Sequence, residues 1–218
     1  MTNRLSGLYI ITPSLLISED KFDSQQLERY LNKIEAALKS GARVVQFRDK
    51  TSNDALRIKL ARALLALCHS YQVPLIINDD VELAAEIGAH GVHLGKDDAS
   101  VSLARDRLGS QAIIGVSCYN QLSLAIKAQT QGADYIAFGR FFPSRTKPQA
   151  IQADLGLLTQ AKRELRIPVV AIGGIDQTNA YQLIKAGADL LAIVGGVFDQ
   201  ADISLAAKAI VDCFNKPQ

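Results

Sequence analysis

Short runs of Val, Ile, Leu and Phe, separated by segments with helical periodicity, constrain the fold of this chain more than any other feature of its sequence. The runs lack the alternation of apolar and polar residues that marks a sheet with one face in water. This is typical of parallel strands whose outer face is covered. The pattern predicts eight strands, at residues 7–12, 43–48, 74–79, 91–95, 112–117, 135–139, 169–174 and 190–196.

The segments between these strands carry apolar residues at helical spacing. A helix with such a stripe covers a sheet with its apolar face. Helices are therefore expected to alternate with strands along the chain. In the first two segments the stripes are formed by Leu27, Leu31, Ile34 and Leu38, and by Leu56, Leu60, Leu64 and Leu67.

A three-residue pattern, Gly-Ala followed by a polar residue, recurs at residues 41–43, 88–90, 132–134 and 187–189. Each copy closes a predicted helix before a strand, and Gly suits that place because it adopts the left-handed conformation without a steric penalty. The copies precede every second strand, so the chain divides into four βαβα quarters. This favours an α/β fold of the closed (β/α)8 TIM-barrel type over a doubly wound open sheet, with residues 1–218 as a single domain.

Composition and charge narrow the class of protein. Hydrophobic residues make up 48% and charged residues 21% of the chain, as in average soluble domains. A net charge of +2 is too small to indicate nucleic-acid binding. Apolar runs of strand length and the absence of a secretory signal predict a cytoplasmic protein with no membrane contact. Cys68, Cys118 and Cys213 lie far apart, which predicts reduced thiols.

In a barrel of this type, the site forms where strands end and the loops to the next helices begin. Gln46, Arg48 and Lys50 follow one another at a spacing of two at the end of the second strand. An extended segment points such residues the same way, so an amide and two cations could face one anion, which suits a diphosphate. The alternative is that Arg48 and Lys50 pair with carboxylates around the rim.

Carboxylates follow the third and fourth strands. Asp79 and Asp98 end neighbouring strands, and acidic oxygens opposite a phosphate-binding cluster are the ligands that Mg²⁺ prefers. Asp80 and Asp97 are adjacent competitors for this role. The alternative is that these acids cap the helices that follow, a common role for Asp at a strand-to-helix turn.

Two further segments are suited to a phosphate. The loop after the sixth strand carries hydroxyls and cations between two prolines, and glycine pairs end the seventh and eighth strands, where barrels often bind phosphate with bare backbone. The residues concerned are Ser144, Arg145, Thr146 and Lys147 in the loop and Gly173, Gly174, Gly195 and Gly196 in the pairs.

The histidines and cysteines give little sign of a catalytic nucleophile. His69, His90 and His93 lack a spacing that indicates metal ligation, and structural roles are expected for them. Cys118 has no histidine near it in the sequence to activate it. Without a nucleophile, the clearest features are the two predicted phosphate subsites, one of them with acidic residues that could bind a metal ion. They indicate the joining or exchange of two phosphorylated molecules.

The motifs that mark these sites occur in the order found in thiamine phosphate synthases, and the resemblance covers nearly the whole chain. This family implies a transferase that condenses 4-amino-2-methyl-5-pyrimidinylmethyl diphosphate with 4-methyl-5-thiazole-ethyl phosphate, with Mg²⁺ as cofactor. The motifs are Gln-Phe-Arg-Asp-Lys at 46–50, Asn-Asp-Asp at 78–80, Gly-Val-His-Leu-Gly at 91–95, Gly-Val-Ser at 115–117, Phe-Pro-Ser-Arg-Thr-Lys at 142–147 and Ile-Gly-Gly-Ile at 172–175.

The resemblance also implies a role for each matching residue. The pyrimidine diphosphate would meet Gln46, Phe47, Arg48, Asp49, Lys50, Asn78, Ser117 and Lys147, of which Arg48, Lys50, Ser117 and Lys147 would be catalytic. Mg²⁺ would be held by Asp79 and Asp98, and the thiazole phosphate by Ser144, Arg145, Thr146, Gly174, Val194 and Gly195.

Two of these positions depart from the commonest family pattern, because Ser144 stands where Thr is usual and Gly195 where Ser is usual. Gly195 leaves only backbone to bind phosphate, so its departure bears on affinity. The implied mechanism is dissociative: diphosphate leaves, and the thiazole nitrogen captures a carbocation-like pyrimidine methylene. Two alternatives stay open, a related thiazole tautomerase and a non-catalytic sensor of a thiamine precursor. The sequence also leaves open whether the chain forms a homo-oligomer.

Overall fold

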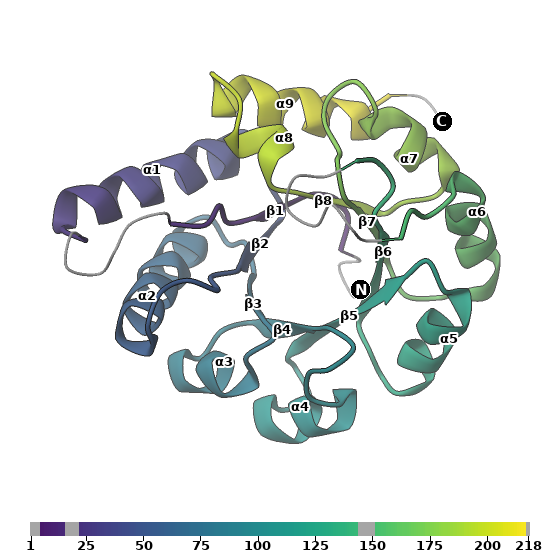
Figure 1. The fold of residues 1–218 in the computed structure, drawn as a ribbon, viewed down its shortest axis with the longest axis horizontal. Helices are drawn as coiled ribbons and strands as arrows, with labels where there is room; N and C mark the ends of the chain where they lie inside the picture. Colours follow the sequence, from purple (N-terminus) through teal and green to yellow (C-terminus); the bar gives the residue numbers. More distant parts are fainter. Residues whose placement is uncertain (1–4, 16–21, 144–150, 217–218) are drawn as a thin grey trace.

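The predicted eight-stranded closed barrel is confirmed. A computed structural model describes residues 5–15, 22–143 and 151–216. In this part of the chain, parallel strands close in sequence order, with β8 paired to β1 (Figure 1). The strands are β1 (Gly7–Ile11), β2 (Val44–Phe47), β3 (Leu75–Asn78), β4 (Gly91–Leu94), β5 (Ile113–Tyr119), β6 (Tyr135–Gly139), β7 (Val169–Ile172) and β8 (Leu190–Ile193).

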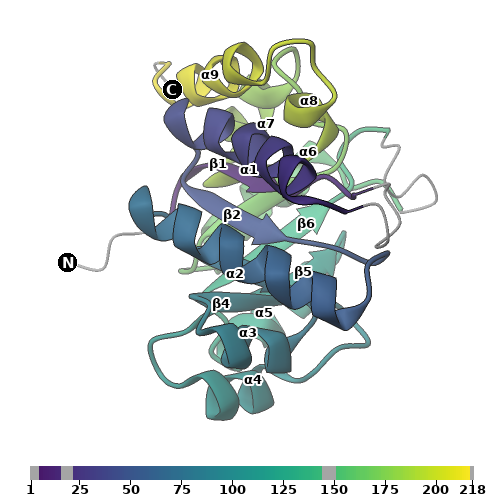
Figure 2. The ribbon, with the colours of Figure 1, turned by 90° about the vertical axis from the view of Figure 1, so that its left-hand side faces the viewer.

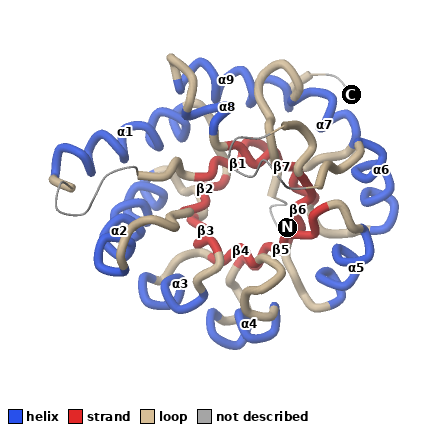
Figure 3. The backbone as a smooth tube through the Cα atoms, viewed as in Figure 1, coloured by secondary structure: helices blue, strands red, loops and turns tan. Residues whose placement is uncertain are grey.

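Helices form an outer ring around the strands, as Figure 3 shows by colour. Helix α1 packs against both α2 and α9, so the first and last helices of the ring are neighbours. Figure 2 shows α1 and α2 crossing the outside of the barrel. The helices are α1 (Ser24–Lys39), α2 (Asp54–Ser70), α3 (Val81–Ile87), α4 (Val101–Leu108), α5 (Leu122–Thr130), α6 (Leu155–Glu164), α7 (Ala180–Ala186), α8 (Gly195–Phe198) and α9 (Ile203–Phe214). None of the described helices is long and apolar enough to cross a membrane.

Two apolar cores follow from the alternation of side chains along the strands. The larger core fills the space between the strands and the helices and includes Ile34, Leu60 and Leu64 from the predicted helical stripes. The smaller core contains Tyr9, Ile76 and other strand residues that point into the barrel. Both faces of the strands are therefore buried, which explains why their sequences lack alternation.

The four Gly-Ala repeats end helices as expected, because each glycine has a left-handed backbone, with φ of +103° at Gly41, +69° at Gly88, +89° at Gly132 and +119° at Gly187. In each repeat, the alanine N–H donates to the carbonyl five residues earlier, and the glycine N–H donates to the carbonyl three residues earlier. This is the Schellman arrangement, which satisfies the last carbonyls of a helix.

The polar residue of each repeat ties the new strand to the preceding one. In three copies, the polar residue makes two hydrogen bonds with one residue of the preceding strand: its backbone N–H donates to the carbonyl of that residue, and its side chain accepts the N–H of the same residue. The side-chain bonds join His90 Nδ1 to Leu75 N (3.1 Å), Asp134 Oδ2 to Ile114 N (2.7 Å) and Asp189 Oδ2 to Val169 N (2.8 Å). Asp134 also pairs with Arg105 at 2.7 Å, and Asp189 with Lys162 at 2.9 Å. The repeat therefore organises the amino ends of the strands.

Candidate active site

A cavity of about 460 Å³ opens where the strands end. Its floor is formed by side chains that point into the barrel, and its wall by the loops that follow the strands. Predicted site residues that line it are Gln46, Arg48, Asn78, Ser117, Gly174, Val194 and Gly195. The structure therefore brings together residues that lie far apart in the sequence.

At the end of β2, alternate residues face opposite sides of the strand. Gln46 and Arg48 line the cavity. Phe47, only 2% exposed, packs in the core between strands and helices and is not among the residues that line the cavity. The structure therefore places Gln46 and Arg48 at the cavity and gives the Phe47 side chain a packing role.

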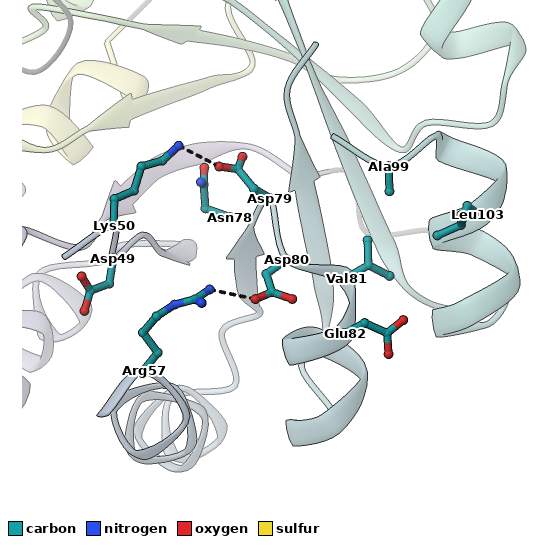
Figure 4. Close-up of a pocket in the computed structure, with 10 residues that line it drawn as sticks. All are labelled: Asp49, Lys50, Arg57, Asn78, Asp79, Asp80, Val81, Glu82, Ala99 and Leu103. Atoms are coloured by element: carbon teal, nitrogen blue, oxygen red, sulfur yellow. Dashed lines mark hydrogen bonds and ion pairs between the residues drawn. The ribbon is translucent and has the colours of Figure 1, made fainter. Parts of the chain in front are cut away.

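Asp49 shapes the loop after β2. Its Oδ1 accepts hydrogen bonds from Thr51 N (2.8 Å), Thr51 Oγ1 (2.9 Å) and Ser52 N (3.1 Å). Burial alone would raise the pKa of Asp49, but the hydrogen bonds from Ser52 and Thr51 outweigh it and lower that pKa. In Figure 4 its carboxylate lies away from Asp79. The observed role of Asp49 is to fix the loop that carries Lys50.

Lys50 and Asp79 line a second pocket, of about 580 Å³, that shares Asn78 with the cavity, and Asp98 contacts Asp79 there. Lys50 Nζ lies 3.1 Å from Asp79 Oδ2 (Figure 4), and Asp79 is hydrogen-bonded to Asp98. Burial raises the pKa of Asp98, with a further rise from Asp79, while the Gly95 N–H opposes it at 2.6 Å. Burial also raises the pKa of Asp79, but Asp98 and Lys50 outweigh it and lower that pKa. The contact therefore shifts the pKa values of the two carboxyl groups in opposite directions, that of Asp98 upward and that of Asp79 downward.

Asp80, one residue further on, has a different task. Its Oδ1 accepts the N–H of Leu83 at 2.9 Å and caps α3, and its Oδ2 pairs with Arg57 at 2.8 Å. The helix-capping alternative is thus correct for Asp80. Asp79 instead adopts a left-handed backbone with φ of +65°, which is uncommon for a residue other than glycine and is often found at functional sites. Because of that conformation, the carboxyl groups of Asp79 and Asp80 have different partners although the two residues are adjacent in the sequence.

The donor set of Asp79 and Asp98 fits Mg²⁺. Two carboxyl groups in contact attract a cation or a proton, and Mg²⁺ usually takes one or two carboxylates, with water and phosphate oxygens as the other ligands. No group of three or more His, Cys, Asp or Glu side chains that could hold a metal ion occurs within residues 5–15, 22–143 and 151–216. The pair therefore suits an ion that is completed by a phosphorylated substrate.

On the other side of the cavity the wall is mostly backbone. Gly174 has φ of +65°, and an added Cβ would lie 2.3 Å from the Pro143 carbonyl oxygen, so this position requires glycine. Val194 and Gly195 complete this wall at the start of α8. Bare backbone at this place in a barrel is typical of a phosphate subsite. Ser144, Arg145, Thr146 and Lys147 lie outside the described residues, and the loop positions on either side of them, Pro143 and Ile151, are described.

The floor of the cavity holds residues that the sequence did not identify as site residues. Tyr9 and Tyr135 are joined by a hydrogen bond of 2.8 Å, and His93 connects Tyr135 to Ser117. The sequence does contain a sign of them: these residues are polar side chains at inward positions of otherwise apolar strands, and such side chains need hydrogen-bond partners inside the barrel. His93 was expected to be structural, and it lies against a predicted substrate residue.

The fold and the site together define a class of protein: (β/α)8-barrel enzymes that act on phosphorylated substrates. In this class, cationic side chains, carboxylates suited to a metal ion and exposed backbone N–H groups lie at the carboxyl ends of the strands. Residues 9–197 match the thiamine monophosphate synthase family. The chain belongs to this family, and it is a transferase.

Individual relatives agree with this assignment. The chain is 50% identical to the thiamine-phosphate synthase of Nitrosococcus oceani over 96% of its own length and 93% of the relative. It is 48% identical to that of Methylococcus capsulatus over 97% and 91%. Among solved structures, thiamine phosphate pyrophosphorylase from Pyrococcus furiosus superposes with a TM-score of 0.80 at 29% identity and covers 96% of this chain and 95% of its own.

Proposed function

We propose that residues 1–218 act as one catalytic domain that joins 4-amino-2-methyl-5-pyrimidinylmethyl diphosphate to 4-methyl-5-thiazole-ethyl phosphate, with thiamine phosphate and diphosphate as products. The observation that carries this proposal is the contact of Lys50, Asp79 and Asp98 next to a cavity that has glycine backbone in its wall. Lys50 and Asp79 line the second pocket, of about 580 Å³, that shares Asn78 with this cavity. One side suits a diphosphate with a metal ion, and the other suits a single phosphate.

Asp79 and Asp98 would hold Mg²⁺, with Lys50 turning from Asp79 to the diphosphate. When bound there, Mg²⁺ supplies neutralising charge to the diphosphate oxygens. Arg48 lines the cavity and would add a fixed positive charge to the leaving group. Lys147 remains a predicted third cation. These charges favour departure of the diphosphate because they act where negative charge develops.

In the proposed reaction, the bond between the pyrimidine methylene carbon and the diphosphate oxygen breaks, and its electron pair leaves with diphosphate. The lone pair of the thiazole nitrogen then forms the new carbon–nitrogen bond. Backbone at Gly174 and Gly195 would hold the thiazole phosphate so that this nitrogen faces the methylene carbon, which replaces a random encounter with a fixed geometry. No protein nucleophile takes part in these steps.

The acids and Lys50 also distinguish this proposal from its rivals. A thiazole tautomerase binds the thiazole phosphate and a sensor binds a thiamine precursor, and neither releases diphosphate, so neither requires two carboxylates and a lysine beside the cavity. Their contact supports a synthase over both.

The test is a coupled assay. Purified protein, the pyrimidine diphosphate and the thiazole phosphate are incubated with and without Mg²⁺, and thiamine phosphate is followed as fluorescent thiochrome. Mg²⁺-dependent product is expected. Binding of the thiazole phosphate without product would favour the tautomerase or the sensor. A Lys147→Ala variant should slow single-turnover product formation, and an unchanged rate would remove Lys147 from the mechanism.

A further inference from the structure

A buried chain of hydrogen bonds crosses the floor of the cavity. It runs from Gln46 on β2 through Tyr9 on β1, Tyr135 on β6 and His93 on β4 to Ser117 on β5. The distances are 2.7 Å from Gln46 Nε2 to Tyr9 OH, 2.8 Å between the two tyrosine oxygens, 3.0 Å from Tyr135 OH to His93 Nδ1 and 2.9 Å from His93 Nε2 to Ser117 Oγ. Both ends of the chain are predicted substrate residues.

The hydroxyl groups inside this chain cannot turn to bulk water for a partner. Tyr9 and Tyr135 are each 1% exposed. Burial raises the pKa of both phenols above its ordinary value, so each keeps its hydrogen and has one hydrogen bond to donate. A buried donor needs an acceptor, because a hydrogen left without one costs the hydration that it has lost.

The donor at the Gln46 end sets the direction of every other bond. Gln46 Nε2 can only donate, so the Tyr9 oxygen accepts from it. Among the described residues, Tyr135 is the other hydrogen-bond partner of the Tyr9 hydroxyl, so Tyr9 donates to Tyr135. Tyr135 must then donate to His93.

His93 Nδ1 is therefore the acceptor in its bond with Tyr135, which places the ring hydrogen on Nε2. That hydrogen is donated to Ser117 Oγ. The reverse arrangement, with a hydrogen on Nδ1 or on both ring nitrogens, would make His93 donate to Tyr135. Tyr135 would then donate back to Tyr9, whose hydrogen would have no acceptor among the described residues.

We infer that Tyr9, Tyr135 and His93 form a one-way hydrogen-bond chain that holds Ser117 as a hydrogen-bond donor to the substrate. This inference rests on the proposed function for the identity of that substrate. Because the Ser117 oxygen accepts from His93, its own hydrogen is left for a partner in the cavity. The diphosphate oxygens gain negative charge as the carbon–oxygen bond breaks, so a donor held in place helps them to leave. Tyr9, Tyr135 and His93 are positioning residues in this role.

The direct test reads the ring hydrogen of His93 in the absence of substrate. The full chain is labelled with ¹⁵N, and long-range ¹H–¹⁵N correlations are recorded at neutral pH. The chain has three histidines, and a His93→Gln variant identifies the signals of His93 by their loss. We expect a neutral His93 ring with its hydrogen on Nε2. A hydrogen on Nδ1, or on both nitrogens, would overturn the inference. This readout does not depend on the proposed reaction.

A Tyr135→Phe variant tests the consequence for catalysis. Without the Tyr135 hydroxyl, His93 should lose its single tautomer, and kcat should fall about tenfold while the KM for the thiazole phosphate stays within about twofold. Tyr71→Phe is the matched control, since the Tyr71 hydroxyl donates to Glu35 in the helical layer at 2.7 Å, and we expect its kcat to match the wild type. A Tyr135→Phe protein with the wild-type tautomer and kcat would contradict the chain.

Discussion

Acidic residues at the amino ends of the barrel strands are satisfied by cations and backbone groups, whereas two acids at the carboxyl ends lie against one another. Asp189 accepts the Val169 N–H and pairs with Lys162. Asp79 contacts Asp98 and has a left-handed backbone. Asp79 and Asp98 also have partners of their own, Lys50 and the Gly95 N–H, but their contact with each other adds like charge at one place, which favours a bound cation. The amino ends of the strands thus contribute to stability, whereas the carboxyl ends carry the candidate site.

The strongest test of this division compares two adjacent acids. Asp79→Ala should lower kcat/KM roughly 10³-fold, because charge on the leaving diphosphate loses its metal ligand, and should leave the thermal midpoint close to that of the wild type. Asp80→Ala should do the opposite and cost about 1 kcal/mol of stability, because it removes the cap of α3, with kcat/KM retained. Steady-state kinetics and thermal unfolding measure both. An active Asp79→Ala enzyme would end the metal assignment.

At the amino ends, Asp189→Ala should remove about 2 kcal/mol from the free energy of unfolding, because the Val169 N–H loses its acceptor and Lys162 its partner. Asp189→Asn keeps an acceptor oxygen and should lose less. Urea denaturation measures both changes, and kcat per folded molecule should stay that of the wild type. Lost activity in a folded Asp189→Ala protein would mean that the two ends are coupled.

A smaller effect is expected at the helix-ending glycines. An added Cβ at Gly187 would lie 2.5 Å from Lys162 Cγ, whereas at Gly88 it would meet nothing within 4 Å. Both positions have positive φ, so alanine should cost about 1–2 kcal/mol at each, with the larger loss at Gly187. Thermal unfolding of Gly187→Ala and Gly88→Ala shows the order. Equal losses would mean that Lys162 moves aside freely.

The smallest effect is expected for Gly195→Ser at the carboxyl ends. An added Cβ would lie 2.5 Å from Asp199 Oδ2, the end of a side chain that can turn away. The new hydroxyl can donate to a phosphate, so the KM for the thiazole phosphate should fall about threefold with kcat unchanged. Initial-rate kinetics measure this. A raised KM would show that the Asp199 carboxylate dominates this wall.

The fold was predictable because both faces of each strand are buried and each helix-ending glycine is marked in the sequence. The strand ends were less so: β5 was expected to end at Ser117 but runs to Tyr119 through an irregular pairing with β6. Such irregularities depend on the neighbouring strand, which local sequence does not specify.

The site was predictable in part. Spacing by two predicted that Gln46, Arg48 and Lys50 face the same way. Gln46 and Arg48 line the cavity, whereas Lys50 pairs with Asp79 as the alternative had it. The separate tasks of Asp79 and Asp80 depend on one backbone angle, which neighbouring side chains do not reveal. Tyr9 and Tyr135 lie 126 residues apart, so their bond follows only from the register of the closed barrel.

The proposed function depends on a metal ion that the carboxyl ends of β3 and β4 would hold for a diphosphate. Titration with Mn²⁺, which shares the oxygen preference of Mg²⁺, in the presence of inorganic diphosphate and with detection by electron paramagnetic resonance tests this directly. We expect the wild type and Asp80→Asn to bind one ion per chain and Asp79→Asn to bind none under the same conditions. Binding that survives in Asp79→Asn would contradict this expectation.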